Sequence, residues 1–194
     1  MAELTPQDVA DYTNNRLPAD DPETQRLLDY ALAAVRNYCE WHVTPPRDET
    51  LVFDGEGSRI LVLPTMYLVE LKSVEENGHS LDVSGLVASA YNAGKRTPVR
   101  LRKRSGGVWA MGYSNIVVEM THGFDEEDAA DFRLAVLDAV DRFAQTKGNV
   151  SVGGLKRYDV DDVKREWFDP RAGDFAERVI NERLVEPYRI LLPH

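Results

Sequence analysis

The stretch DPETQRLLDYALAAVRNYC, residues 21–39, decides the helical part of the fold. Its apolar residues recur at steps of three and four, at Leu28, Leu32, Val35 and Cys39. This spacing puts them on one face of a helix of about five turns. Asp21-Pro22-Glu23 is a start signal, because proline suits the first helical position and an acid lies near the positive helix end. We predict an amphipathic helix with Cys39 buried as a small hydrophobic residue, not a nucleophile.

Three further helices are expected outward from this stretch. Thr5-Pro6-Gln7-Asp8 predicts a short helix with threonine as its cap. A third helix is predicted over residues 125–146, with four acids in its first turn. Its buried stripe would be Ala129, Phe132, Val136, Val140 and Phe143. A last helix would begin at Asp174, where Glu177 could complete a capping box.

Between helices two and three, residues 50–121 have a sequence pattern typical of β-structure. Short runs of strand formers, such as Ile60-Leu61-Val62-Leu63, alternate with turn signals. Asn77-Gly78 predicts a tight hairpin between strands at 68–74 and 81–83. We therefore expect an antiparallel β-unit of six or so strands.

These elements predict an α+β fold, a bundle of about four helices with an antiparallel β-unit inserted between helices 2 and 3, and a C-terminal helix with an extended tail. The expected organisation is helices 1 and 2 in 1–49, the β-unit in 50–122, helix 3 in 123–149, a mobile loop in 150–173, and the last helix and tail in 174–194. The chain has 194 residues, enough for one sizeable core.

Composition excludes several classes of protein. The net charge is −10, whereas a free-standing DNA-binding protein usually carries a basic excess. No run approaches the roughly 18 apolar residues of a membrane helix, and no signal peptide is expected at the N-terminus. With Cys39 as its single cysteine the chain cannot form an internal disulfide, which suits a reducing cytoplasm.

The residues offer no catalytic, cofactor or metal site. The four histidines are scattered without the spacing of a metal-binding motif. The segment Asp54-Gly55-Glu56-Gly57-Ser58 lacks the lysine and the following helix of a phosphate-binding loop, so it is a strand-connecting turn. Acids at 159–166 lack the glycine and spacing of a calcium loop. We expect the protein not to be an enzyme.

One segment concentrates positive charge in an otherwise acidic chain. Its cations are Lys95, Arg96, Arg100, Arg102, Lys103 and Arg104. In a strand, Arg100, Arg102 and Arg104 would share one face, opposite Val99 and Leu101. Three interpretations stay open: a solvated edge strand whose charges deter aggregation, contact with an acidic neighbouring subunit, or contact with DNA phosphate.

The C-terminal tail is apolar although chain ends are usually polar. Exposing its aliphatic side chains would forgo about 1.5–3 kcal/mol each relative to burial. Either the tail folds back onto its own core, or it docks into a partner. The candidate docking residues are Tyr188, Arg189, Ile190, Leu191, Leu192, Pro193 and His194. A loop that orders on assembly is expected at Val152, Gly153, Gly154, Leu155 and Tyr158.

Three stretches, in this order, resemble a known family. They are Leu4-Thr5-Pro6-Gln7-Asp8-Val9-Ala10 with the helix that follows it, Leu63-Pro64-Thr65-Met66-Tyr67-Leu68-Val69-Glu70-Leu71-Lys72-Ser73-Val74, and Val117-Val118-Glu119-Met120-Thr121-His122-Gly123-Phe124. Across roughly the first 150 residues the chain resembles the head-to-tail connector, or adaptor, proteins of siphophages, especially those that infect actinobacteria.

The resemblance implies a head completion protein of the virion without catalytic residues or cofactors. Such connectors are assembled in the host cytoplasm as a dodecameric ring under the portal protein, which they bind. They extend the DNA channel, through which DNA passes without sequence-specific binding, and present a surface to a stopper or tail-completion protein. Two alternatives stay open: a stopper or tail-completion ring protein, and a nucleic-acid-binding module.

Overall fold

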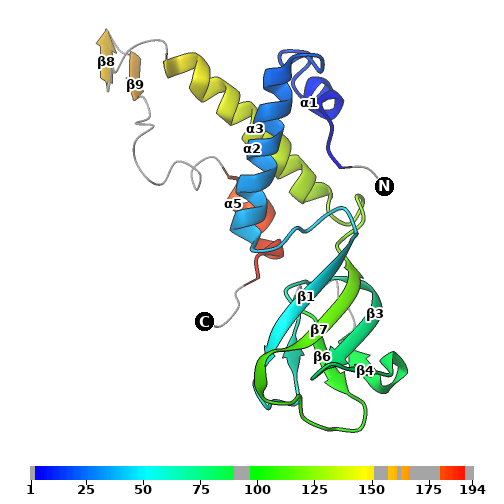
Figure 1. Cartoon of the computed structure of the whole chain (residues 1–194). Coiled ribbons are helices and arrows are strands. Elements are labelled where there is room, and N and C mark those ends of the chain that lie inside the picture. Colours follow the sequence, from blue (N-terminus) through cyan, green and yellow to red (C-terminus); the bar gives the residue numbers. More distant parts are fainter. Residues whose placement is uncertain (1–2, 90–96, 151–156, 161–162, 167–179, 191–194) are drawn as a thin grey trace. The chain divides into compact units, whose positions relative to one another are not determined.

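The computed structural model describes residues 3–89, 97–150, 157–160, 163–166 and 180–190 (Figure 1). The chain divides into two compact units. The β-unit comprises Met1–Glu3, Arg36–Ala130 and Glu186–His194, and the helical unit comprises Leu4–Val35 and Asp131–Val185. The predicted α+β class, with an antiparallel β-structure inserted between helices 2 and 3, is confirmed.

The helical unit is built from α1 (Pro6–Tyr12), most of α2 (Pro22–Cys39), α3 (Ala130–Val150) and α5 (Glu182–Val185). Local chemistry starts α1 as predicted, because the Thr5 and Asp8 side chains form a reciprocal capping box. Ion pairs join Arg16 to Asp141 and Arg133 to Asp8, so the α1 region is fixed to α3. The predicted face of α2 is buried at Leu28, Leu32, Val35 and Cys39.

Two helix boundaries differ from the prediction. The third helix begins at Ala130 and not at residue 125, and the acids of residues 125–128 form the turn before it. Ala129, Phe132, Val136 and Val140 are buried as predicted, whereas Phe143 is half-buried. Of the predicted last helix, Asp174 and Glu177 lie outside the described residues, and within them the helix is limited to Glu182–Val185.

The described residues of the β-unit form seven strands, in two antiparallel sheets. One sheet has the order β1-β7-β3-β4, the other β2-β6-β5. The strands are β1 (Arg47–Gly55), β2 (Leu61–Val62), β3 (Leu68–Glu76), β4 (His79–Leu81), β5 (Leu86–Ala88), β6 (Arg100–Lys103) and β7 (Gly112–His122). The long strands β1 and β7 lie side by side in Figure 1 and pair along most of their length.

The two sheets of the β-unit share one hydrophobic core. Leu61, Leu101 and Trp109 belong to the same buried cluster as Val74, Ile116 and Val118 of the four-stranded sheet. Side chains alternate between the two faces of a strand. The neighbours of these core residues along each strand therefore point away from the core, so each sheet has an outer face.

The Asn77-Gly78 hairpin is confirmed. Both residues have positive φ, 53° and 74°, and they join β3 to β4. The predicted strand at 81–83 is wrong beyond Leu81, because the Asp82 side chain accepts a hydrogen bond from Ser84 N and caps a short 3-10 helix, η1 (Val83–Gly85).

The segment predicted as a mobile loop contains a hairpin that the sequence did not indicate. Strands β8 (Arg157–Val160) and β9 (Val163–Glu166) pair antiparallel, and the candidate loop residue Tyr158 lies in β8. In the described part of the chain, none of the helices has the length and apolar character that a membrane crossing requires.

Candidate assembly surfaces

The strand β6 carries the described part of the basic segment. Val99 and Leu101 are buried, while Arg100 and Arg102 are exposed, as the predicted alternation requires. The edge-strand interpretation is wrong, because β6 lies between β2 and β5. Neither Arg100 nor Arg102 has an ion pair among the described residues.

Lys103 differs from its neighbours because the β-unit itself neutralises it. Its ammonium donates to both carboxylate oxygens of Glu76, at 2.8 and 2.6 Å, and to the carbonyl oxygen of Val108 at 2.9 Å. It also lies 4.9 Å from the centre of the Trp109 ring. Glu76 in turn accepts from Ala110 N at 2.7 Å. This network fixes the loop before β7 and makes Lys103 a structural residue of the β-unit.

Burial raises the pKa of Glu76, but the hydrogen bonds from Lys103 and Ala110 and the charge of Lys103 outweigh it, so the pKa lies below its usual value.

Of the other candidate cations, Arg104 is exposed and donates from Nε to the carbonyl oxygen of Ser84 at 3.4 Å. Lys95 and Arg96 lie outside the described residues.

The outer face of the four-stranded sheet is acidic. Its exposed carboxylates come from all three long strands: Asp48 on β1, Glu70 and Glu75 on β3, and Glu119 on β7. Lys72 pairs with Asp48 at 2.6 Å, and this hydrogen bond lowers the pKa of Asp48. Sequence analysis missed this face, because the acids are separated along the chain and only the strand pairing brings them together.

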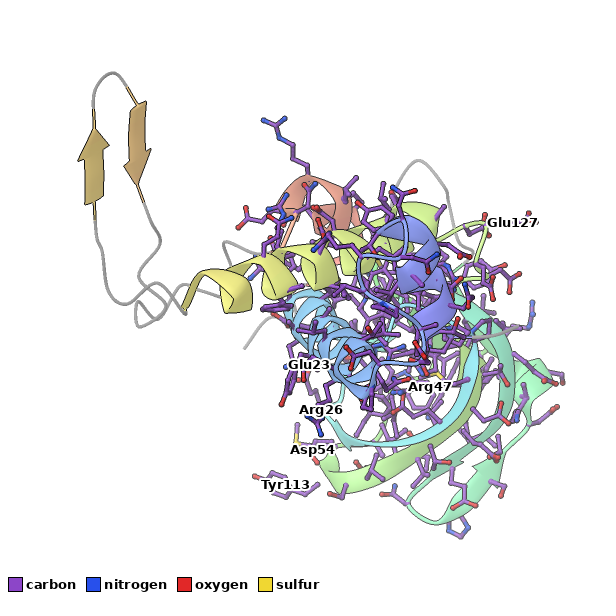
Figure 2. The ribbon with its side chains drawn as sticks, turned by 90° about the horizontal axis from the view of Figure 1, so that it is seen from above. Glu23, Arg26, Arg47, Asp54, Tyr113 and Glu127 are labelled. Carbon is purple, nitrogen blue, oxygen red and sulfur yellow. The ribbon has the colours of Figure 1, made fainter. Side chains whose placement is uncertain are left out.

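An apolar tip is formed by the connection between β6 and β7 and by the start of β7. Val108, Met111 and Tyr113 are 52%, 80% and 92% exposed. Figure 2 shows the side chain of Tyr113 near that of Asp54, and Asp54 accepts a hydrogen bond from Ser114 N at 2.6 Å. Such exposed large side chains are typical of interaction surfaces. The sequence signal that could have found them is the apolar residues beside Gly106-Gly107.

The C-terminal segment folds back onto the β-unit, the first of the two arrangements that the sequence left open. Tyr188, in the short 3-10 helix η2 (Glu186–Tyr188), and Ile190 are fully buried. The Trp41 ring N–H donates to the carbonyl oxygen of Tyr188 at 2.6 Å, and Ile190 N donates to that of Cys39 at 3.1 Å. The guanidinium of Arg189 lies 4.9 Å from the centre of the Tyr38 ring.

The remaining tail residues, Leu191, Leu192, Pro193 and His194, lie outside the described residues, as do Val152, Gly153, Gly154 and Leu155 of the candidate loop.

Cys39 is buried, and burial raises the pKa of its thiol to about 12. That environment fits its predicted packing role.

A buried pair of histidines contacts Trp41, the residue whose ring N–H binds the C-terminal segment. The rings of His42 and His122 are 4.8 Å apart and edge-on, and the ring of Trp41 stacks near His122. His42 Nε2 lies 2.5 Å from the carbonyl oxygen of Pro45, and His122 Nε2 lies 2.7 Å from Glu49 Oε2. Burial lowers the pKa of His42 to about 4. The pair joins the end of α2 to β1 and β7, which sequence reasoning missed because the two histidines are far apart in the chain.

This pair does not form a metal centre with its neighbours. Throughout the part of the chain that the structure describes, no group of three or more histidine, cysteine, aspartate or glutamate side chains is arranged to hold a metal ion. Of the predicted strand-connecting turn Asp54–Ser58, Asp54 and Gly55 are the last residues of β1, and only Glu56, Gly57 and Ser58 lie in the connection to β2.

Comparisons with known proteins give matches of structure alone. No protein-family profile matches the chain, and no curated protein matches it. The fold is similar to a chain in the neck of an empty gene transfer agent (GTA) particle computed with C6 symmetry, with a TM-score of 0.59 and 13% identity over 98% of this chain and 91% of that one. It is also similar to chains in the neck of a native GTA particle computed with C12 symmetry (TM-score 0.61, 12% identity, 100% and 95% covered) and in the virion of a native GTA particle (0.61, 12%, 98% and 91%).

Proposed function

We propose that this chain is a structural subunit of the neck of a phage-like particle, where it forms the adaptor ring between the portal and the tail-proximal stopper. The observation that carries the proposal is the likeness of fold to chains of GTA necks and virions, which extends over nearly the whole of both chains. A match of this extent includes both units and their order along the chain. The resemblance of the N-terminal, β3 and β7 stretches to siphophage connectors points the same way.

The ring would act by assembly and not by chemistry. Two of the similar structures were computed with C12 and C6 symmetry, and a ring of twelve identical subunits fits both. Such a ring needs heterologous contacts that close after a fixed number of copies. It would extend the DNA channel of the virion, with the portal on one side and a stopper or tail-completion protein on the other. DNA would pass without sequence-specific contacts, and the ring would form in the host cytoplasm.

The part of the tail that docks on the portal would be residues 191–194. Tyr188 and Ile190 are buried in the β-unit, so they anchor the tail instead of reaching a partner. Tyr158 lies in β8, so the loop that would become ordered in the assembly is limited to residues 152–155, where contact area offsets the entropy cost.

The experiment that tests the proposal is native mass spectrometry of the chain alone and with purified portal rings. We expect a closed ring that contains only this chain or that is bound to the portal. A chain that binds only tail proteins would favour the stopper alternative. A chain that stays monomeric under all these conditions, or that turns over a small molecule, would refute the proposal.

A further inference from the structure

The outer face of the sheet β2-β6-β5 is basic. Arg100 and Arg102 are exposed on its central strand, and their partners across the ladder are Val62 and Val87. Val87 is 40% exposed, so an exposed apolar side chain lies across the ladder from Arg102. We call Arg100, Arg102, Val62 and Val87 the basic face.

The outer face of the sheet β1-β7-β3-β4 has the opposite charge and a similar apolar centre. Val52 is 57% exposed and pairs with Val117 across β1 and β7. Exposed Glu75 is the partner of Val117 on β3, and Glu119 lies two residues further along β7. We call Val52, Val117, Glu75 and Glu119, with Glu70 beside them, the acidic face.

The two faces lie on opposite sides of the β-unit. Both sheets contribute to a single hydrophobic core, so their outer faces point away from each other. A surface and its complement at opposite sides of a subunit produce a heterologous contact, which forms a ring where the rotation closes. Two complementary faces on one side would instead produce a two-fold dimer.

We infer that the ring is held together in part by head-to-tail docking of the basic face of one copy on the acidic face of the next. This inference rests on the proposed function and adds the contact between subunits. Arginine suits the contact, because its planar guanidinium can form two parallel hydrogen bonds to a carboxylate. The valines at the two centres supply the apolar surface that such a contact buries.

A second copy fits the basic face better than DNA does. A DNA-binding surface requires several cations that neutralise phosphates in an environment of favourable potential. The described basic face has two arginines on a chain of net charge −10, and the other side of the same unit would repel the phosphates. An acidic face with exposed carboxylates and valines is the complement that this chain itself provides.

Charge reversal on one face at a time tests the contact. Arg100→Glu/Arg102→Glu makes both faces acidic, and Glu75→Lys/Glu119→Lys makes both basic. Because like charges across an interface cost several kcal/mol, we expect each double variant alone to self-associate about 100-fold or more weakly than the wild type. An equimolar mixture should restore assembly, since the two variants can alternate around a ring with an even number of copies. The quadruple variant restores the original net charge and exchanges the two faces, so it should assemble alone.

Sedimentation velocity and native mass spectrometry, with and without portal rings, give the readout. Double variants that form rings as the wild type does would overturn the face pairing and leave the proposed function intact. The same conclusion would follow if both double variants lost assembly and neither the mixture nor the quadruple variant regained it. A wild-type chain that never forms a ring would refute the proposed function.

Cross-linking tests the contact directly, even where assembly is weak. Cys39 is buried, so a short bis-maleimide should react with cysteines introduced on the surface. We expect Val52→Cys mixed with Val87→Cys to give a covalent dimer, and neither variant alone to give one, because a head-to-tail contact never places a face against itself. Val108→Cys, at a site 52% exposed outside both faces, is the matched control. Equal dimer yields for Val52→Cys with Val108→Cys and with Val87→Cys would refute the inference.

Discussion

Glu76→Gln should destabilise the β-unit by about 1–2 kcal/mol, because Glu76 neutralises a partly buried lysine. The side chains of Glu76 and Lys103 are 13% and 18% exposed, and two hydrogen bonds join the ammonium to the carboxylate. Glutamine has nearly the shape of glutamate but no charge. The substitution therefore leaves the packing in place and removes the charge that Lys103 faces.

The size of the expected stability loss follows from the interactions of Lys103 that remain in the Glu76→Gln variant. A hydrogen bond to a charged group contributes about 1.5–3 kcal/mol, and loss of a fully buried partner costs about 3–5 kcal/mol. Lys103 retains the Val108 carbonyl and the Trp109 ring, and the glutamine oxygen can still accept from Ala110 N. Residual exposure lets water screen the uncompensated charge. These compensations reduce the expected loss to about 1–2 kcal/mol.

Urea unfolding, followed through hydrogen exchange of the β7 amides, measures this loss within the β-unit. Glu75→Gln is the matched control, since Glu75 is the exposed neighbour on the same strand, and it should stay within about 0.5 kcal/mol of the wild type. The folded-state pKa of Glu76 is lowered, so its contribution is present above the unfolded pKa and is lost as the pH falls through the folded pKa. Two variants with equal stabilities at neutral pH would refute the assignment of Lys103 to the β-unit's own network.

Three further outcomes follow from the histidine pair and the tail. Gly123→Ala should lower the free energy of unfolding, measured by thermal denaturation, by about 2 kcal/mol or more. The reason is that Gly123 has φ +122° and a Cβ there would lie 2.7 Å from the His42 ring. A variant as stable as the wild type would contradict this clash and show that the ring can move aside. Burial places the folded pKa of His42 at about 4, below the unfolded value of about 6.5, so the unfolded state binds more protons between these two pH values. Urea titrations should therefore show the free energy of unfolding falling by up to about 3 kcal/mol as the pH drops through that window. A pH-independent stability would contradict neutral burial of this ring. Deleting residues 187–194 should remove at least about 3 kcal/mol of stability, because it takes away buried Tyr188. Deleting residues 191–194 should instead leave the described fold intact and weaken only portal binding in a pull-down. A 187–194 deletion variant as stable as the wild type would contradict the packing of the tail.

Helices and the hairpin could be predicted because their signals are local. The capping box of Thr5 and Asp8, Pro22 at the start of α2, and the positive φ values of Asn77 and Gly78 each depend on residues within a few positions. The predicted start of α3 was wrong for a related reason. Acids favour the first turn of a helix, but they also suit the turn before it, and local sequence does not separate the two.

The assembly of the strands into two sheets could not be predicted in the same way. Alternation identified the exposed arginines of β6, yet it carries no information about which strands lie beside β6. The pairing of β3 with β7, which brings Glu75 next to Val117, joins positions far apart in the sequence. The acidic face and the partner of Lys103 both depend on such pairings, and so they emerged only from the structure.

The sequence left the tail undecided for a similar reason. Its apolar character requires burial, but burial against the chain itself and burial against a partner leave the same composition. The structure decides for Tyr188 and Ile190, because Trp41 and Cys39 supply their hydrogen-bond partners within the β-unit.

The distribution of charge is compatible with the proposed self-assembly of an acidic chain. A net charge of −10 makes copies repel one another at long range, and this repulsion keeps free subunits apart. At contact distance the local pattern matters more, since salt screens charges separated by more than about 10 Å at 0.1 M ionic strength. Two faces of opposite sign on opposite sides of the β-unit then favour one orientation, head to tail, over the like-charged alternatives. In the proposed ring, the basic face on β6 would therefore set the orientation in which one subunit meets the next.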